Sequence, residues 1–477
     1  MLRFLCRQSR AGWGGFVRRN ACAIPGEGFS RLRIGTRCGK IGKNGREGIF
    51  IMLLFTGGTV WRGGQFREEP LAVSGANIVP CPAGTNGASV IRVPGCVIVP
   101  GFTDVHVHFR QPGFAYKETI YSGTFAAAAG GYTTVCAMPN LNPVPDTPEH
   151  LQAELDLIQR DAIIRVWPYG SITRGEQGAE LSDFAALAPY VAGFSDDGKG
   201  VQSREVMREA MEHAKGVEKP IVAHCEDESL LRKDWAIHDG AFARRNGFPG
   251  NASESEWRQV ERDLELVRET GCQYHVCHVS TKESVALIRD AKRDGLPVSC
   301  ETAPHYLALT DEELSDDGRF KMNPPIRSAD DRDALLAGLL DGTIDCIATD
   351  HAPHSAGEKS RGLRGSLNGV VGLETAFPVL YTNLVETGLV PLETLLRALC
   401  VRPREIFGFA ACTLSPGEAA DFTILDLNRP HTVNSTRFHS LGRATPFDGW
   451  GVSAAVAMTV CGGKIVYHNL PYREGIS

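Results

Sequence analysis

Residues 104–113 of the chain read DVHVHFRQPG. The apolar run at residues 96–102 leads directly into this stretch, in which His106 and His108 are two residues apart. In a β-strand, side chains two residues apart point to the same face, so both imidazoles can converge on one metal ion. Arg110 follows just before a Pro-Gly turn and could bind an anion there. The stretch therefore predicts a strand that ends in a metal site with an adjacent cationic group.

Three further potential ligands stand where an apolar run ends and a polar segment begins. His224, His278 and Asp350 each follow directly after such a run. A paired histidine on a strand is more often structural than functional when it stands alone. Four such coincidences in one chain are hard to attribute to chance, so we expect these residues to share one site.

The composition is that of an ordinary globular protein. The chain has 477 residues, of which 43% are hydrophobic and 22% are charged. Its net charge of −6 argues against a nucleic-acid-binding surface. The sequence contains no stretch of around 18 apolar residues, so no membrane span is predicted. The 14 cysteines are scattered without a Cys-x-x-Cys pair, which is typical of reduced thiols in a cytoplasmic protein.

Residues 1–51 differ from the rest of the chain. They carry eleven Lys or Arg against only Glu27 and Glu47. This Arg-rich, acid-poor composition is typical of a mitochondrial transit peptide. We favour a second interpretation, in which translation starts at Met52. Residues 52–60 resemble a first strand, and residues 46–48 have purine-rich codons that can form a ribosome-binding sequence before the Met52 codon. On either interpretation, we expect residues 1–51 to be a disordered or non-native extension.

Strand-like and helix-like segments alternate through the centre of the chain. The helix-like segments are amphipathic, and two of them begin at potential caps, Thr147 and Ser203. Eight alternating strands over roughly 300 residues predict an α/β fold with a (β/α)₈ TIM-type barrel. No Gly-x-Gly-x-x-Gly follows the first strand, which argues against a dinucleotide-binding sheet. The eight expected strands are residues 96–108, 132–138, 163–168, 191–194, 220–224, 273–279, 297–300 and 345–349.

Two further segments flank the expected barrel. Both contain short strand-like runs separated by turn signals. We expect them to combine into one small β-sandwich, with residues 52–98 as its first part, residues 99–410 as the barrel and residues 411–477 as its second part. Candidate ligands then fall at the carboxyl ends of the barrel strands, where such barrels carry their active sites.

The order of these ligands resembles the amidohydrolase superfamily. More narrowly, the chain resembles the dihydroorotase family from Met52 to its C-terminus. The resemblance implies a hydrolase of de novo pyrimidine (UMP) biosynthesis that reversibly cyclises N-carbamoyl-L-aspartate to L-dihydroorotate. The motifs that carry it are residues 104–113, 137–140, 194–198, 223–227, 321–327 and 349–354.

The resemblance also implies one or two Zn²⁺ per chain. Many superfamily members bridge two metals with a carboxylated lysine after the fourth strand, but here residues 193–199 read GFSDDGK. We assign the ligand role to Asp197, keep Asp196 as the alternative, and consider Lys199 less suitable. Asp350 is expected to be catalytic as well, taking a proton from metal-bound water and giving it to the leaving nitrogen. The complete expected ligand set is His106, His108, Asp197, His224, His278 and Asp350.

Four residues are expected to bind the substrate. Arg110 can form a bidentate contact with a carboxylate. The resemblance adds Asn140 and His354 to this contact and places Asn323 against the pyrimidine ring. Both asparagines could instead be turn residues beside prolines. Residues 355–372 lack periodicity and are interpreted as a rim or lid of the site.

Two other functions are less consistent with the sequence. A dihydropyrimidinase or allantoinase would have a lysine within the fourth strand, which this chain lacks. A catalytically inactive scaffold, for example for aspartate transcarbamoylase, would be expected to lose metal ligands, whereas every expected position is filled. An active enzyme could still bind that partner, and we also expect a homo-oligomer.

Overall fold

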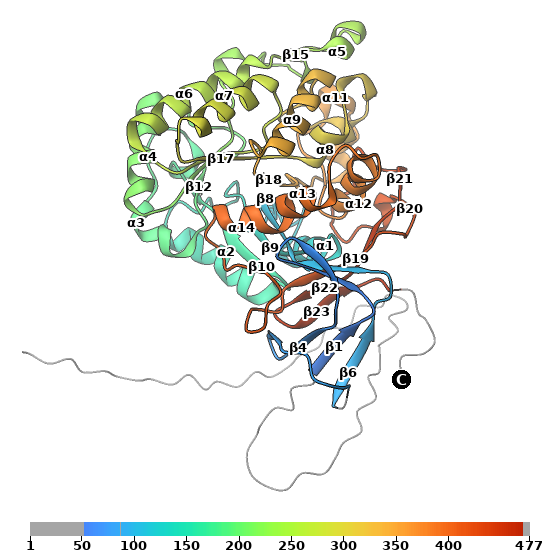
Figure 1. The fold of residues 1–477 in the computed structure, drawn as a ribbon. Coiled ribbons are helices and arrows are strands. Elements are labelled where there is room, and N and C mark those ends of the chain that lie inside the picture. Colours follow the sequence, from blue (N-terminus) through green and yellow to red (C-terminus); the bar gives the residue numbers. More distant parts are fainter. Residues whose placement is uncertain (1–51, 86, 471–477) are drawn as a thin grey trace, which may run out of the picture. The chain divides into compact units, whose positions relative to one another are not determined.

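The computed structural model of the chain describes residues 52–85 and 87–470 (Figure 1). The expectations for residues 1–51 lie outside these described residues. Within the described ranges, no helix combines the length and the apolar character that a membrane crossing requires.

A series of parallel strands carries the candidate ligands. The strands pair in the order β10-β9-β8 and β11-β12-β13-β16-β17-β18. Only Tyr169 separates β10 from β11, so the two sheets follow one another along the chain. A parallel bridge between Val107 and His351 also connects the end of β8 to the segment that follows β18. The strands are β8 (Phe102–Val107), β9 (Tyr132–Ala137), β10 (Arg165–Pro168), β11 (Gly170–Ser171), β12 (Phe194–Ser195), β13 (Ile221–Ala223), β16 (Tyr274–Val276), β17 (Val298–Thr302) and β18 (Cys346–Ile347).

Helices lie between successive parallel strands, as the alternating pattern predicts, except between β10 and β11. The Thr147 hydroxyl caps α2 by accepting the amide of His150, and the Ser203 hydroxyl caps α4 by accepting the amide of Val206. Both predicted caps are therefore confirmed. The principal helices are α1 (Ile120–Ala129), α2 (Pro148–Asp161), α4 (Arg204–Gly216), α6 (Glu254–Thr270), α7 (Lys282–Arg293) and α9 (Ala329–Asp341).

Shorter helices fill the connections. Two π-helical turns, Tyr381–Val385 and Arg397–Val401, directly follow α12 and α13. The short helices are α3 (Phe184–Leu187), α5 (Ala241–Asn246), α8 (Pro304–Ala308), α10 (Ala356–Lys359), α11 (Gly362–Gly365), α12 (Ala376–Leu380), α13 (Leu392–Leu396) and α14 (Arg402–Ile406).

The two terminal segments form sheets together. Strand β7 pairs antiparallel with β19, with Ile98 opposite Ile424, so the N-terminal and C-terminal parts share one six-stranded sheet. Figure 1 shows β1, β4 and β6 beside β22 and β23, and residues from both segments, such as Phe55 and Phe422, pack in one apolar cluster. The strands are β1 (Met52–Thr56), β2 (Thr59–Arg62), β3 (Gln65–Glu68), β4 (Leu71–Ser74), β5 (Asn77–Val79), β6 (Ala88–Arg92), β7 (Val97–Pro100), β19 (Phe422–Asp426), β22 (Ala455–Cys461) and β23 (Lys464–His468).

Two small strand pairs complete the described fold. They are β14 (Ile237–His238) with β15 (Gly250–Asn251), and β20 (His431–Thr432) with β21 (Gly451–Val452).

One prediction about local structure was wrong. The run at residues 96–108 is not one strand, because it divides at Gly101 into β7 and β8, which belong to different sheets. A Cβ at Gly101 would collide with the side chain of Thr133, so the chain passes too close to the neighbouring strand there for any side chain. The segment at residues 355–372, which we expect to be a rim or lid of the site, contains α10 and α11.

Candidate active site

The expected ligands lie at the carboxyl ends of five parallel strands. His106 is the second-last residue of β8, and His224 follows β13 directly. Asp197, His278 and Asp350 come two or three residues after their strands. Because parallel strands end at one edge of a sheet, residues far apart in sequence meet there.

Asp197 is surrounded by four imidazoles. Its Oδ1 atom lies 3.3 Å from His106 Nε2 and 3.7 Å from both His224 Nδ1 and His278 Nε2. Its Oδ2 atom lies 3.4 Å from His108 Nε2. Burial raises the pKa of Asp197, but the charges of His106 and His108 outweigh burial and hold the pKa well below its usual range. The carboxylate is therefore ionised at the centre of the cluster.

Asp350 also contacts the two histidines His106 and His108. Its Oδ1 atom lies 3.2 Å from His108 Nε2 and 3.7 Å from His106 Nε2. Asp350 adopts a φ of 47°, in the left-handed region that non-glycine residues rarely use. Burial raises its pKa, but the hydrogen bond with His108 and the charges of both histidines hold the pKa at about 2.

The donor set fits a metal ion. His106 Nε2 and Asp197 Oδ1 are buried and make no hydrogen bond with any described residue. Nitrogen and carboxylate oxygen atoms that converge without hydrogen bonds are typical of a divalent cation site. Ligand atoms of His106, Asp197 and His278 lie within 4.8 Å of one another, as do those of His106, His108 and Asp350.

Asp196 points away from this cluster. Its Oδ1 atom accepts the backbone amides of Ile172 at 2.8 Å and Thr173 at 3.0 Å. Lys199 donates to the backbone oxygen of Glu176 at 3.2 Å. The geometry therefore favours Asp197 among the three candidates that the sequence left open.

Glu301 supports the cluster from within the sheet, and sequence reasoning missed it. Its Oε1 atom lies 2.7 Å from His106 Nδ1, and its Oε2 atom lies 3.2 Å from His275 Nε2. Burial raises the pKa of Glu301, but the charge and hydrogen bond of His106 outweigh burial and hold the pKa at about 2. An ionised Glu301 accepts the Nδ1 proton of His106 and leaves Nε2 free for a metal.

Asn140 has a comparable place beside the second histidine. Its Oδ1 atom lies 2.9 Å from His108 Nδ1 and accepts Arg110 Nη1 at 3.5 Å. Arg110 also donates through Nε to the backbone oxygen of Pro353 at 3.3 Å. The structure thus brings Arg110 and Asn140 together at the cluster, with the guanidinium making no ion pair within the described residues.

His354 lies beside a lysine that sequence reasoning also missed. Its Nε2 atom is 2.6 Å from the backbone oxygen of Asn368, and its Nδ1 atom is 3.1 Å from Lys117 Nζ. Burial and the charges of Arg110 and Lys117 lower the pKa of His354 to about 3. The imidazole is therefore neutral, and Nδ1 accepts the lysine proton while Nε2 donates. Lys117, three residues before α1, carried no distinguishing signal in the sequence.

Asn323 Nδ2 lies 3.4 Å from His224 Nε2, and both residues contact a second glutamate that sequence reasoning missed. Asn323 Nδ2 donates to Glu226 Oε2 at 3.0 Å, and the same oxygen lies 3.6 Å from His224 Nε2. The only sequence signal was the position of Glu226, two residues after the expected ligand His224. All ten expected site residues are thus located in one region, and their individual roles stay predictions.

Comparisons with known proteins point to one family. A family model described as dihydro-orotase-like matches residues 95–284. A dihydroorotase of Geobacillus sp. strain WCH70 is 52% identical over 380 residues, which cover 79% of this chain and 89% of that protein. A dihydroorotase of Anoxybacillus flavithermus is 47% identical over 409 residues, which cover 85% of this chain and 95% of that protein.

Solved structures share the fold. An L-hydantoinase (dihydropyrimidinase) from Arthrobacter aurescens aligns with a TM-score of 0.76 at 25% identity, covering 88% of this chain and 97% of that one. A dihydropyrimidinase from Brevibacillus agri NCHU1002 aligns with a TM-score of 0.77 at 21% identity, covering 88% and 95%. Together with the half-identical relatives, these results establish that the chain belongs to the dihydroorotase family of cyclic amidohydrolases.

Proposed function

We propose that the chain catalyses the reversible cyclisation of N-carbamoyl-L-aspartate to L-dihydroorotate in pyrimidine biosynthesis, with zinc as its cofactor. The observation that carries this proposal is the position of Arg110. Its guanidinium lies beside the histidine cluster and is held only by neutral oxygen atoms of Asn140 and Pro353. An uncompensated cation next to a candidate metal centre suits a cyclic amide that carries a carboxylate.

Six residues would hold one or two zinc ions. Their imidazole and carboxylate groups are those that zinc prefers. When bound, zinc acts as a Lewis acid that withdraws electrons from the carbonyl of the reacting amide. The proposed ligands are His106, His108, Asp197, His224, His278 and Asp350.

Asp350 would move the proton in both directions of the reaction. In hydrolysis, its carboxylate accepts a proton from the attacking water as the new carbon–oxygen bond forms. The protonated Asp350 then donates to the ring nitrogen as the carbon–nitrogen bond breaks. In cyclisation the same steps run in reverse, and water is lost.

Four residues would bind the organic part of the substrate. Arg110 would form the ionic contact with the substrate carboxylate, Asn140 would contribute a neutral hydrogen bond, and His354 would line the same part of the site beside Lys117. Asn323 contacts the ring from the His224 side. This arrangement places the reacting amide between the anion contact and the histidine cluster.

The finer architecture is also a proposal. A closed eight-stranded barrel would span residues 99–410, supported by the two series of parallel pairings and the bridge from Val107 to His351. A β-sandwich would combine residues 52–98 with residues 411–477, supported by the pairing of β7 with β19. A cytoplasmic location, a homo-oligomer and an aspartate transcarbamoylase partner stay predictions from the sequence.

Substrate selectivity tests the proposal. We expect the purified chain to hydrolyse dihydroorotate at least about 100-fold more efficiently than dihydrouracil or allantoin, because only dihydroorotate carries a carboxylate for Arg110. A preference for dihydrouracil or allantoin would instead indicate the dihydropyrimidinase or allantoinase activity and contradict the proposal.

A further inference from the structure

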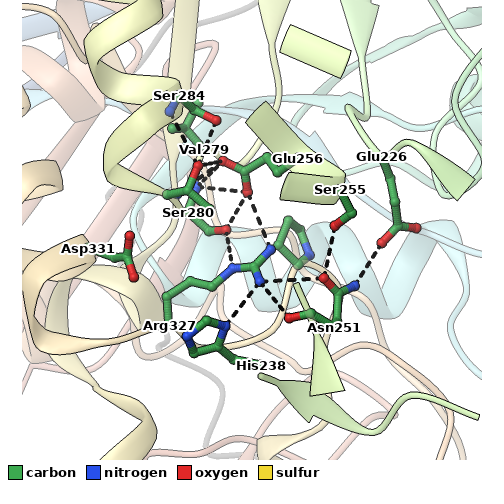
Figure 2. A network of polar contacts seen from close by, with 12 residues as sticks. Glu226, His238, Asn251, Ser255, Glu256, Val279, Ser280, Ser284, Arg327 and Asp331 are labelled. Carbon is green, nitrogen blue, oxygen red and sulfur yellow. Dashed lines mark hydrogen bonds and ion pairs between the residues drawn. The ribbon is translucent and has the colours of Figure 1, made fainter. Parts of the chain in front are cut away.

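A chain of buried hydrogen bonds begins at Arg327, at the end of the loop that carries Asn323. Figure 2 shows the Arg327 guanidinium enclosed by His238, Asn251, Ser280 and Glu256. Arg327 Nη1 lies 3.4 Å from the side-chain oxygen of Asn251 and 3.2 Å from its backbone oxygen. The Ser255 hydroxyl donates to the same side-chain oxygen at 2.9 Å. Because a guanidinium can only donate, the side-chain oxygen of Asn251 must face Arg327.

This orientation determines the next contact. With its oxygen held by Arg327, Asn251 directs its amide nitrogen toward Glu226 and donates to Oε1 at 3.2 Å (Figure 2). The other oxygen of Glu226 accepts Asn323 Nδ2 at 3.0 Å. A carboxylate can only accept, so the amide nitrogen of Asn323 must face Glu226. The amide oxygen of Asn323 therefore faces away from Glu226.

The amide oxygen of Asn323 is a buried acceptor without a donor. No described residue makes a hydrogen bond with it. A buried acceptor left unpaired is costly, so a ligand that supplies a donor gains affinity there and a ligand without one loses affinity. Both dihydroorotate and carbamoyl aspartate carry N–H groups that could supply this donor.

We propose that Glu226 is a positioning residue that makes Asn323 an obligate hydrogen-bond acceptor for an N–H group of the substrate. This inference rests on the proposed function and specifies how the site recognises an N–H group of the substrate. Glu226 holds the nitrogen of Asn323, and the contact with Asn251 and Arg327 holds Glu226. The site thereby selects a cyclic or open urea that still carries a hydrogen on nitrogen.

Replacing Glu226 by glutamine tests this directional effect. Glutamine has one acceptor and one donor end, and Asn251 can only donate toward it. The new amide in E226Q would therefore turn its nitrogen toward Asn323, and Asn323 would rotate to present its own nitrogen to the substrate. We expect E226Q to raise the KM for dihydroorotate about tenfold or more and to change kcat less than about threefold.

The experiment must separate this role from an effect on the metal, because Glu226 also lies 3.6 Å from His224 Nε2. Zinc content is therefore measured for each variant by mass spectrometry, and folding is checked by thermal unfolding. We expect E226Q to keep the zinc content of the wild type. The matched control is S255A, which removes one donor to Asn251 but leaves Arg327 in place, and we expect its KM to stay within about twofold of the wild type.

A double-mutant cycle shows whether Glu226 acts through Asn323. N323A should raise KM about as much as E226Q, and adding E226Q to N323A should raise KM less than about twofold further. An equal effect of E226Q in both backgrounds, or a loss of zinc with unchanged KM per loaded site, would overturn the inference. N323A with a wild-type KM would also overturn it, even if E226Q failed to fold.

Failure of the proposed function gives a different result. A zinc-loaded wild-type chain without dihydroorotate turnover would overturn the function itself. An active wild type whose E226Q variant keeps its KM would overturn only the role of Glu226.

Discussion

On one side of the site, four imidazoles and two carboxylates come from the ends of parallel strands, whereas on the other side the polar groups come from loops. On the strand side, a ring nitrogen of each of two histidines faces an acceptor, at 2.7 Å from Glu301 for His106 and 2.9 Å from Asn140 for His108. His224 Nε2 lies between Asn323 Nδ2 at 3.4 Å and Glu226 Oε2 at 3.6 Å. On the loop side, Arg110 donates only to neutral oxygen atoms.

This difference shows how two sides of one site can suit ligands of opposite charge, a cation on the strand side and an anion on the loop side. The strand side holds its imidazole rings in place, so little reorganisation would be needed for a cation to bind there. The loop side leaves a positive charge without a carboxylate partner, so an anionic substrate can supply one. Perturbing each side should therefore affect different measured quantities.

The largest expected effect comes from D350A, on the strand side. Loss of the proton acceptor should lower kcat for dihydroorotate hydrolysis by about 10³-fold or more. Because the other five proposed ligands remain, the chain should still bind zinc. Steady-state kinetics and zinc content in the same sample check this prediction, and near-normal turnover by D350A would show that another residue transfers the proton.

The next largest effect comes from R110K, on the loop side. Lysine keeps the positive charge but cannot form the two parallel contacts of a guanidinium. We expect KM for dihydroorotate to rise about 30-fold while the zinc content stays the same. A change in kcat alone, with unchanged KM, would contradict the assignment of Arg110 to the substrate carboxylate.

A smaller effect is expected from E301Q, which sharpens the comparison on the strand side. Glutamine can keep a hydrogen bond to His106 but removes the negative charge that faces it. We expect zinc affinity, measured by competition with a chelator, to fall about tenfold. E154Q is the matched control, since Glu154 is another buried glutamate with 1% exposure that lies on α2, and it should leave zinc affinity unchanged.

The smallest expected effect is a pH dependence of the loop side. Lys359 donates to the backbone oxygens of Lys321 and Leu367, both at 2.8 Å, and burial together with the charge of Lys321 lowers its pKa to about 7. Between pH 7 and about 10.4, the unfolded chain holds a proton on this lysine that the folded chain lacks. Stability therefore rises with pH in this window, by at most about 1.4 kcal/mol per pH unit, and this contribution becomes constant below pH 7.

Amide hydrogen exchange across residues 356–366 at pH 6, 7 and 8 measures this dependence, after correction for the intrinsic exchange rate. K359M should flatten the rise in protection between pH 7 and 8, whereas K464M, which removes an exposed lysine, should keep it. If K359M and the wild type showed the same pH dependence of protection, a titratable group other than Lys359 would be its cause.

Local features of the fold and the site could be predicted from the sequence. The caps Thr147 and Ser203 depend on neighbours three residues away, and His106 and His108 share a face through strand geometry alone. The division at Gly101 was missed although Pro100-Gly101 is a turn signal, because apolar residues continue on both sides of it. Only contact with Thr133 on another strand requires the glycine there.

The supporting acids could not be predicted for the same reason. Glu301 is 195 residues from His106, and Glu226 is 97 residues from Asn323, so no local pattern connects them. The choice between Asp196 and Asp197 also required three-dimensional geometry, because adjacent residues after a strand point in different directions.

Zinc titration of the purified full-length chain tests the central claim most directly. The account predicts one or two zinc ions per chain, loss of dihydroorotate turnover when a chelator removes them, and recovery of turnover when zinc is restored. Full turnover by a chain from which all metal has been removed would contradict it.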